Sequence, residues 1–208
     1  MEAEFWRTHW QEGRIGFHEG APNAFLVRFG ERLAGARRVL VPLCGKAEDL
    51  AYLAGRGHEV VGIELVEDAV RQFFAEHGVE PVITDEAAVR RYRAGTITIL
   101  AGDLFATTAA LVGEIDAIYD RAALVALPSE MRGRYADHLR AIAPGARREL
   151  LVTVEYPEGA AGGPPFSVLP DEVHARFAGA TIEELATGAD PRGRAGGRMI
   201  ERCYALRW

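Results

Sequence analysis

The chain has 208 residues, of which 49% are hydrophobic and 26% charged, a composition typical of a globular protein with one full core. Its net charge of −6 offers no basic surface to nucleic acid or to an anionic membrane, so neither is an expected partner. No apolar run approaches the roughly 18 residues of a membrane span, and the first residues do not resemble a signal peptide.

The chain contains two cysteines, Cys44 and Cys203, which lie far apart and form no CxxC pattern. We therefore expect neither a disulfide framework nor a bound metal, and we predict a location in the reducing cytoplasm.

The first 35 residues read as a helical segment that precedes the sheet. A short helix is expected over 2–11, where Phe5, Trp6 and Trp10 share a face, and a second helix over 23–33. The Gly-rich loop between them, 12–22, carries Phe17 and is typical of a flap over a site. The alternative is a helix that only docks on the domain through its aromatic side chains.

Residues 37–64 form the clearest unit of the chain. Two continuous apolar runs, 39–41 and 60–63, flank a Gly-bearing turn and an amphipathic segment over 46–55, and the second run closes on Glu64. This order of strand, loop, helix, strand and acid predicts a βαβ unit of a nucleotide-binding parallel sheet.

The chemistry of this unit is expected at the carboxyl ends of its strands. Gly45 lets backbone N–H groups approach a ligand, and Glu64 can accept hydrogen bonds from a ribose. The turn has one glycine where G-x-G-x-x-G has three, and Ala47 after Lys46 excludes a P-loop. A cofactor that has a ribose but no phosphate bridge fits this turn better than a dinucleotide does. S-adenosylmethionine is the commonest such cofactor. Alternatively, Glu64 only caps or solvates a loop.

Further strand ends carry polar residues. After a helix over 66–77, a hairpin turning at Ala94–Gly95 and a third strand over 97–100 lead to Asp103 and Leu104, which are placed to border an adenine. Asp103 is equally suited to cap a helix. A fourth strand over 115–119 leads to Arg121, whose guanidinium suits a ligand carboxylate. The alternative is a salt bridge to Asp120 or Glu64.

The remaining chain completes the sheet. We expect a helix over 130–142, a fifth strand over 150–154, a Gly- and Pro-rich loop over 155–165, a short helix over 171–177, and two antiparallel closing strands over 181–185 and 199–206. The fold class predicted is α/β, with seven mostly parallel strands and helices on both faces.

Together these residues resemble the thiopurine S-methyltransferase family, particularly its bacterial members. The resemblance covers nearly the whole chain and rests on FWRTHWQEGRIGFHEG, RVLVPLCGKAEDLAYLAGRGHEVVGIEL, IYDRAALVALP and GPPFSV. It implies a class I methyltransferase fold that uses S-adenosylmethionine. It also implies a single domain, 1–208, with an N-terminal helical cap (1–35) and a cofactor-binding core (36–208). We expect a monomer.

The resemblance implies a role for each site residue. Trp10, Leu43, Gly45, Glu64, Asp103, Leu104 and Arg121 would bind the cofactor, and Phe17, Arg121 and Arg194 would face the acceptor. The family often carries a Trp-Gly pair before its last strand, whereas this chain reads DPRGRAGGRM there. Arg192 or Arg194 would be the arginine that faces the acceptor. Because the Trp-Gly pair is missing, acceptors other than an aromatic thiopurine remain an alternative.

The reaction expected is transfer of a methyl group to a small thiol by direct displacement, without a dedicated catalytic base. Cys44 has no His–acid partner pattern and is not assigned as a nucleophile. Within methyltransferases, halide, selenium or tellurium acceptors are alternatives. Outside that class, a nicotinamide-dependent oxidoreductase conflicts with the single-Gly turn, and a non-catalytic binding protein conflicts with the intact Trp10, Glu64 and Arg121.

Overall fold

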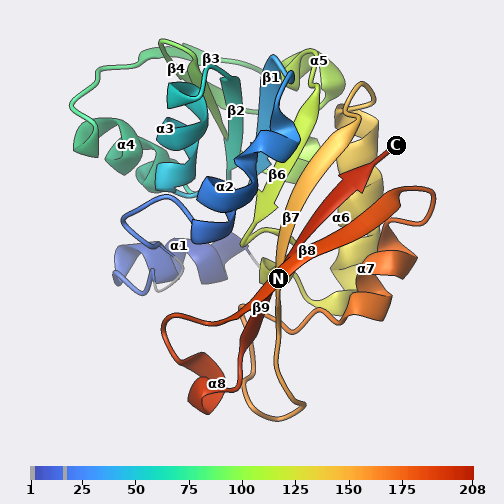
Figure 1. The fold of residues 1–208 in the computed structure, drawn as a ribbon. Helices are drawn as coiled ribbons and strands as arrows, with labels where there is room; N and C mark the ends of the chain where they lie inside the picture. The colour runs from blue at the N-terminus through green and yellow to red at the C-terminus, as the bar shows by residue number, and fades with distance from the viewer. Residues whose placement is uncertain (1–2, 16–17) are drawn as a thin grey trace.

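The computed structural model of the protein describes residues 3–15 and 18–208, and its centre is a nine-stranded mixed sheet with helices on both faces (Figure 1). The strands are β1 (Arg38–Pro42), β2 (Glu59–Glu64), β3 (Val82–Asp85), β4 (Arg90–Ala94), β5 (Ile97–Ala101), β6 (Ala117–Arg121), β7 (Arg148–Glu155), β8 (Thr181–Ala189) and β9 (Ile200–Arg207). The α-helices are α1 (Ala3–Gln11), α2 (Ala24–Phe29), α3 (Glu48–Gly55), α4 (Glu67–Glu76), α5 (Ala109–Val112), α6 (Ser129–Ile142), α7 (Pro170–Arg176) and α8 (Arg194–Gly197). The 3₁₀ helices are η1 (Gly30–Leu33), η2 (Leu104–Ala106) and η3 (Leu124–Ala126).

The strand order is β3-β4-β5-β2-β1-β6-β7-β9-β8. The strands β5, β2, β1, β6 and β7 are mutually parallel, whereas β9 runs antiparallel between β7 and β8. These seven strands are the class I methyltransferase sheet that the sequence predicts, and the antiparallel closing pair is confirmed.

The sheet differs from the prediction by two extra strands, β3 and β4, which extend it antiparallel beyond β5. The turn expected at Ala94–Gly95 does occur, between β4 and β5. Every residue of β3 is exposed, so its side chains do not alternate between a core and solvent. The hydrophobic pattern that reveals a half-buried strand is therefore missing there.

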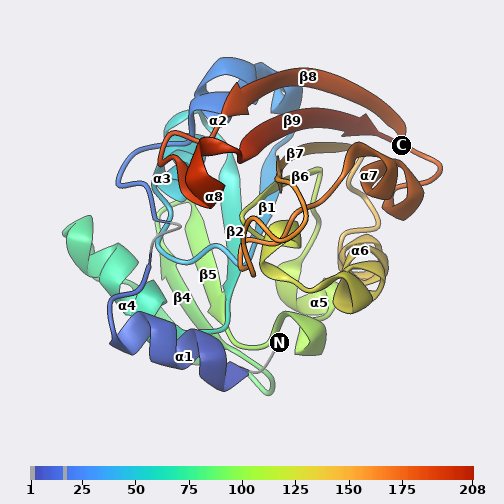
Figure 2. The ribbon, with the colours of Figure 1, turned by 90° about the horizontal axis from the view of Figure 1, so that it is seen from below.

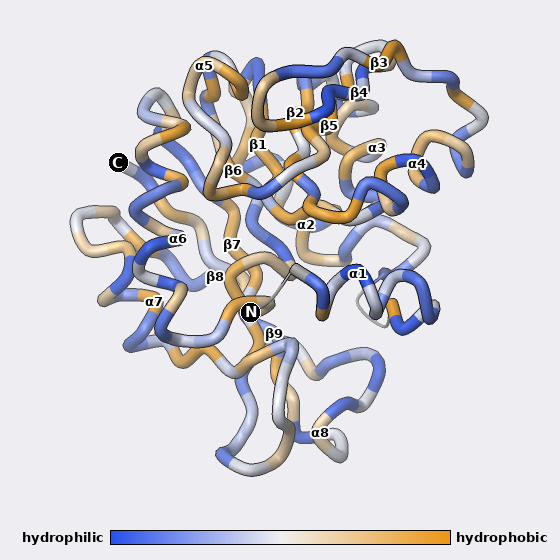
Figure 3. The backbone as a smooth tube through the Cα atoms, turned by 180° about the vertical axis from the view of Figure 1, so that it is seen from behind, coloured by the Kyte–Doolittle hydropathy of each residue, from blue (hydrophilic) through white to orange (hydrophobic). Residues whose placement is uncertain are grey.

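The two faces of the sheet are covered by different helices. Leu26 of α2, Leu50 of α3 and Phe73 of α4 pack in one buried cluster, whereas Leu139 of α6 and Val173 of α7 belong to another. Figure 2 shows these groups of helices on opposite sides of the strands, and in Figure 3 hydrophobic colour follows the central strands. Burial on both faces explains why β1 and β2 read as continuous apolar runs.

The helices expected over 46–55, 66–77, 130–142 and 171–177 are observed as α3, α4, α6 and α7, with ends shifted by one or two residues. The segment 23–33 forms α2 followed by the 3₁₀ helix η1. Within the described ranges, no helix combines the length and the apolar character needed to cross a bilayer. Figure 1 shows α1, α8 and the loop after β7 at one end of the sheet.

Candidate active site

A pocket of about 870 Å³ lies at the carboxyl ends of β1, β2, β5, β6 and β7. Its walls include every site residue that the sequence predicts within the described part of the chain: Trp10, Leu43, Gly45, Glu64, Asp103, Leu104, Arg121 and Arg194. The remaining one, Phe17, lies outside the described residues. The chain thus brings residues from both termini and four strand ends to a single cavity, as the strand-end rule for open α/β sheets predicts.

Glu64 ends β2 inside this pocket with a rigidly held carboxylate. Its Oε2 accepts a hydrogen bond from Gly45 N at 2.8 Å and its Oε1 accepts one from Val66 N at 2.8 Å. The side chain is buried, with 6% of the residue exposed, and burial raises its pKa although the amides favour the ionised form. Each oxygen keeps acceptor capacity for a further donor, since a carboxylate oxygen accepts about two hydrogen bonds.

The loop between β1 and α3 carries an unusual backbone. Leu43 has a φ of 46° and Gly45 a φ of 53°, and the left-handed region is uncommon for a leucine. Such a conformation concentrates at ligand-binding turns, where the surrounding structure imposes it. Between them, Cys44 is buried against Gly62, and burial raises the pKa of its thiol well above the ordinary value. A buried neutral thiol agrees with assigning Cys44 no nucleophilic role.

Asp103 and Leu104 follow β5 at the next strand end. The Asp103 carboxylate accepts a hydrogen bond from Phe105 N at 2.9 Å and so caps η2, which is the structural role considered from the sequence. The capping bond uses Oδ1, and Asp103 remains exposed on the pocket wall. Leu104 is buried beside it, so this strand end offers a polar and an apolar surface together.

Trp10 closes the pocket from the N-terminal helix α1. Only 6% of the residue is exposed, and it packs in a small apolar cluster with Val66 and Ala69 at the start of α4. Trp10 therefore docks α1 on the domain and lines the cavity at the same time. The helix docked by its aromatic side chains, one of the two alternatives drawn from the sequence, is therefore observed, whereas the flap over a site stays a prediction.

Arg121 ends β6, and its side chain is 10% exposed. The sequence offered Asp120 or Glu64 as a salt-bridge partner, but the guanidinium pairs with Glu19, 102 residues away. The Asp120 carboxylate has other partners: it accepts hydrogen bonds from Leu124 N at 3.1 Å and from the Tyr135 hydroxyl at 2.7 Å. Arg121 is thus a pocket cation whose carboxylate partner comes from the N-terminal segment.

A network that the sequence did not reveal holds this segment. The Asn23 amide donates to Glu19 at 3.4 Å, the Asn23 backbone N–H donates to Asp49 at 2.7 Å, and the Tyr119 hydroxyl donates to Asp49 at 3.2 Å. Tyr119 precedes Arg121 by two residues, so the period of a strand would have placed the two on one face. No comparable signal joins Glu19 to Arg121, because their contact depends on the path of a loop.

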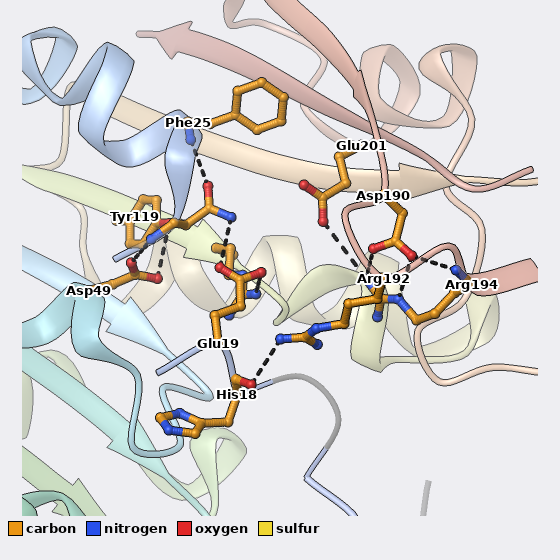
Figure 4. Close-up of polar contacts among 11 residues, drawn as sticks. His18, Glu19, Phe25, Asp49, Tyr119, Asp190, Arg192, Arg194 and Glu201 are labelled. Atoms are coloured by element: carbon orange, nitrogen blue, oxygen red, sulfur yellow. Dashed lines mark hydrogen bonds and ion pairs between the residues drawn. The ribbon is translucent and has the colours of Figure 1, made fainter. Parts of the chain in front are cut away.

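The two C-terminal arginines have separate roles. Arg194 lines the pocket, but its guanidinium donates to Asp190 at 2.8 and 3.1 Å. Arg192 donates instead to the carbonyl of His18 at 2.9 Å. Figure 4 shows this bond joining the segment before β9 to the N-terminal segment. The structure thus places Arg194, and not Arg192, on the pocket wall.

Comparisons with known proteins agree with this architecture. A family model described as thiopurine S-methyltransferase matches residues 1–197. A thiopurine S-methyltransferase of Pseudomonas paraeruginosa is 50% identical over 191 residues, covering 90% of this chain and 88% of the relative. Its counterpart in Pseudomonas fluorescens is 44% identical over 215 residues, covering 99% of this chain and 97% of the relative.

Solved structures share the fold at low sequence identity. A 1,6-didemethyltoxoflavin-N1-methyltransferase of Burkholderia thailandensis, crystallised with its namesake ligand and S-adenosylhomocysteine, has a TM-score of 0.66. It is 17% identical, and the match covers 99% of this chain and 86% of that one. TehB of Haemophilus influenzae has a TM-score of 0.60 at 14% identity, and the match covers 89% of this chain and 60% of that one.

The pocket itself fits a nucleoside that lacks phosphates. The Gly45 N–H, which a phosphate would otherwise use, already donates to Glu64, and Glu64 retains acceptor capacity for ribose hydroxyls. The family match, the fold and this donor–acceptor pattern lead to one conclusion. The chain belongs to the thiopurine S-methyltransferase family and is an S-adenosylmethionine-dependent methyltransferase.

Proposed function

We propose that this enzyme methylates the sulfur of a small thiol acceptor, a thiopurine or a related molecule. The observation that carries the proposal is the continuity of the pocket. One cavity joins Glu64 and Asp103, at the β2 and β5 ends, to Arg121 and Arg194, at the β6 end and before β9. A cofactor and an acceptor can therefore lie side by side in it, which direct transfer requires.

Each end of the cavity has a proposed task. Glu64 binds the ribose hydroxyls, Asp103 and Leu104 border the adenine, and Leu43 and Gly45 shape the loop beneath the cofactor. Trp10 lies against the methionine end of the cofactor, and Arg121 lies between the methionine carboxylate and the acceptor. The acceptor end receives Arg194, and Phe17 by its place in the sequence.

The bound cofactor supplies a methyl carbon on a positively charged sulfur. The residues of this chain contribute positioning, exclusion of water and charge. Apolar side chains such as Val152, Val154 and Pro165 line the acceptor end and remove water from it. The Arg121 guanidinium favours the thiolate of an acceptor, which is the reactive form. Glu19 offsets part of this charge, so acceptors with an already acidic thiol suit the site best.

An alternative within the same chemistry is a halide, selenium or tellurium acceptor. The segment 190–199 favours keeping this alternative open, because it reads DPRGRAGGRM, with three glycines near Arg194 and without the Trp-Gly pair that the family often carries. Incubating the purified protein with S-adenosylmethionine and a panel of thiopurines, other thiols, selenite and halides tests both proposals. Methylation of selenite or halide but of no thiol would overturn the first.

Two organisational proposals accompany this function. Residues 1–35 act as a helical cap on the cofactor-binding core of a single domain, since α1 supplies Trp10 to the pocket. The protein acts as a monomer, which sedimentation or size-exclusion chromatography can check. The reducing cytoplasm expected from the cysteine pattern stays a prediction, and both Cys44 and Cys203 are free and buried.

A further inference from the structure

The acceptor end of the pocket contains a buried carboxylate that the proposed reaction does not use. Glu201 lies on β9 opposite Val154 of β7, and both residues line the cavity. Only 8% of Glu201 is exposed. It lies on the side of the pocket away from Glu64 and Asp103, because β7 and β9 are at the other side of β1 in the sheet.

Glu201 has fewer polar contacts than its burial demands. Among the described residues, Arg194 forms an ion pair with Glu201, but its Nη2 lies 3.8 Å from Oε1, beyond hydrogen-bond distance. The Arg194 guanidinium is already engaged by Asp190. Within residues 3–15 and 18–208, the structure gives the Glu201 carboxylate no hydrogen bond. A buried carboxylate without donors is costly, so a site that retains one favours a ligand that supplies them.

The surrounding charges are nearly balanced. Glu19 and Asp190 are the neighbouring acids, and Arg121 and Arg194 are the neighbouring cations. Figure 4 shows Asp190 and Arg194 beside Glu201. Burial and then Glu19 raise the pKa of Glu201, while Arg121 and Arg194 oppose this rise. Neither cation is dedicated to Glu201, because Arg121 pairs with Glu19 and Arg194 with Asp190. The acceptor end therefore offers one hydrogen-bond acceptor group that the protein leaves unfilled.

We infer that Glu201 is a specificity-determining residue that selects acceptors carrying an exocyclic amino group in addition to the reacting sulfur. This inference rests on the proposed thiol methylation and narrows it to amino-bearing thiols. An acceptor that lacks the amino group leaves the buried carboxylate without a hydrogen bond on binding, and a site of this kind discriminates strongly against such an analogue.

The test uses matched acceptors that differ by one amino group: 6-thioguanine against 6-mercaptopurine, and 2-aminothiophenol against thiophenol. The ratio of kcat/KM for the amino-bearing member to that for its partner is measured in the wild type, Glu201→Met and Glu201→Gln. We expect a ratio of at least about tenfold in the wild type, the effect of one hydrogen bond to a charged group. It should fall close to one in Glu201→Met and at least about threefold in Glu201→Gln, which keeps an oxygen but loses the charge.

Glu184→Gln is the matched control, because Glu184 is a carboxylate on the adjacent β8 that pairs with Arg202 and does not line the pocket. It should leave the ratio at the wild-type value. A wild-type ratio near one for both pairs, or a ratio unchanged in both Glu201 variants, would overturn the inference. If Glu201→Met fails to fold, the Glu201→Gln ratio decides alone.

A binding experiment distinguishes failure of this inference from failure of the proposed reaction. If the wild type methylates no thiol, the same acceptor pairs are titrated into the protein saturated with S-adenosylhomocysteine, with heat of binding as the readout. Tighter binding of the amino-bearing members, lost in Glu201→Met, supports Glu201 as a donor-selecting residue even then. Equal binding of both members, or no binding of either, overturns the inference.

Discussion

The Glu64 carboxylate accepts a hydrogen bond at 2.8 Å from the backbone N–H of Gly45, which lies 19 residues earlier in the chain. This bond joins the ends of β1 and β2, since Gly45 follows the first strand and Glu64 closes the second. The loop after β1 and the acid that ends β2, which both line the pocket, are therefore held by each other. A change in Glu64 affects both binding and the loop.

Replacing Glu64 tests the ribose contact. We expect Glu64→Gln to weaken binding of S-adenosylhomocysteine by about 1.5–3 kcal/mol, the scale of a hydrogen bond to a charged group, as measured by calorimetry. The amide oxygen still accepts one backbone N–H, so the variant should remain folded. The control is Glu59→Gln at the opposite end of β2, where the side chain pairs with Arg37 and Arg38 outside the pocket. Equal affinities in the two variants would remove Glu64 from the cofactor site.

The role of the planar guanidinium group of Arg121 can be tested by substitution. Arg121→Lys keeps the charge but loses the bidentate geometry. Methyl transfer should fall by at least about tenfold, or roughly 1.4 kcal/mol, with little change in melting temperature. Arg202→Lys is the control, because Arg202 on β9 pairs with Glu155 and Glu184 outside the pocket.

A second substitution at the same position separates binding from structure. If Arg121 serves mainly as the partner of Glu19, Arg121→Met leaves a carboxylate behind and lowers the free energy of unfolding by roughly 3–5 kcal/mol. Turnover per folded molecule would then be largely kept. A destabilised but fully active Arg121→Met protein would contradict the assignment of Arg121 to the site.

The Asp49 carboxylate should contribute to stability through the two donors that it satisfies. Asp49→Ala leaves the Asn23 N–H and the Tyr119 hydroxyl without this acceptor, and each buried unpaired donor costs about 1–3 kcal/mol. We expect the free energy of unfolding, from urea titration, to fall by about 2–6 kcal/mol in total. Tyr119→Phe removes only one of the two bonds and should cost clearly less. Equal stability of Asp49→Ala and the wild type would show that water replaces both contacts.

The raised pKa of Asp120 predicts a pH-dependent stability. Burial raises its pKa to about 6, although hydrogen bonds from Tyr135 and the Leu124 amide favour the ionised form. Because the folded pKa exceeds the ordinary value of 3.8, the contribution of Asp120 is fully present below about pH 4. It is lost as the pH rises through about 6, with a slope of up to about 1.4 kcal/mol per pH unit.

The matched variant is Asp120→Asn, whose side chain does not titrate. Chemical denaturation from pH 4 to pH 8 should show that the wild type loses stability relative to Asp120→Asn between about pH 4 and 6, with a constant difference above that range. Parallel stability curves across the whole range would mean that Asp120 has the same pKa in the folded and unfolded chain.

The sequence alone determined the βαβ unit and the positions of its candidate site residues. Apolar runs buried on both faces require continuous hydrophobic residues, so β1, β2 and the acid at position 64 could be read directly. Because parallel strands present their carboxyl ends at one edge, the sequence predicts that Glu64, Asp103 and Arg121 share a pocket, and all three line it.

Only the tertiary structure decided the contacts that depend on loop paths and on strand order. Glu19 meets Arg121 across 102 residues, and Glu201 reaches the cavity because β9 inserts between β7 and β8. Such contacts leave no local period in the sequence, since they arise from how distant segments cross and not from spacing along one helix or strand. The fully exposed β3 escaped prediction for a related reason: without a buried face, the burial of apolar side chains imposes no pattern on its residues.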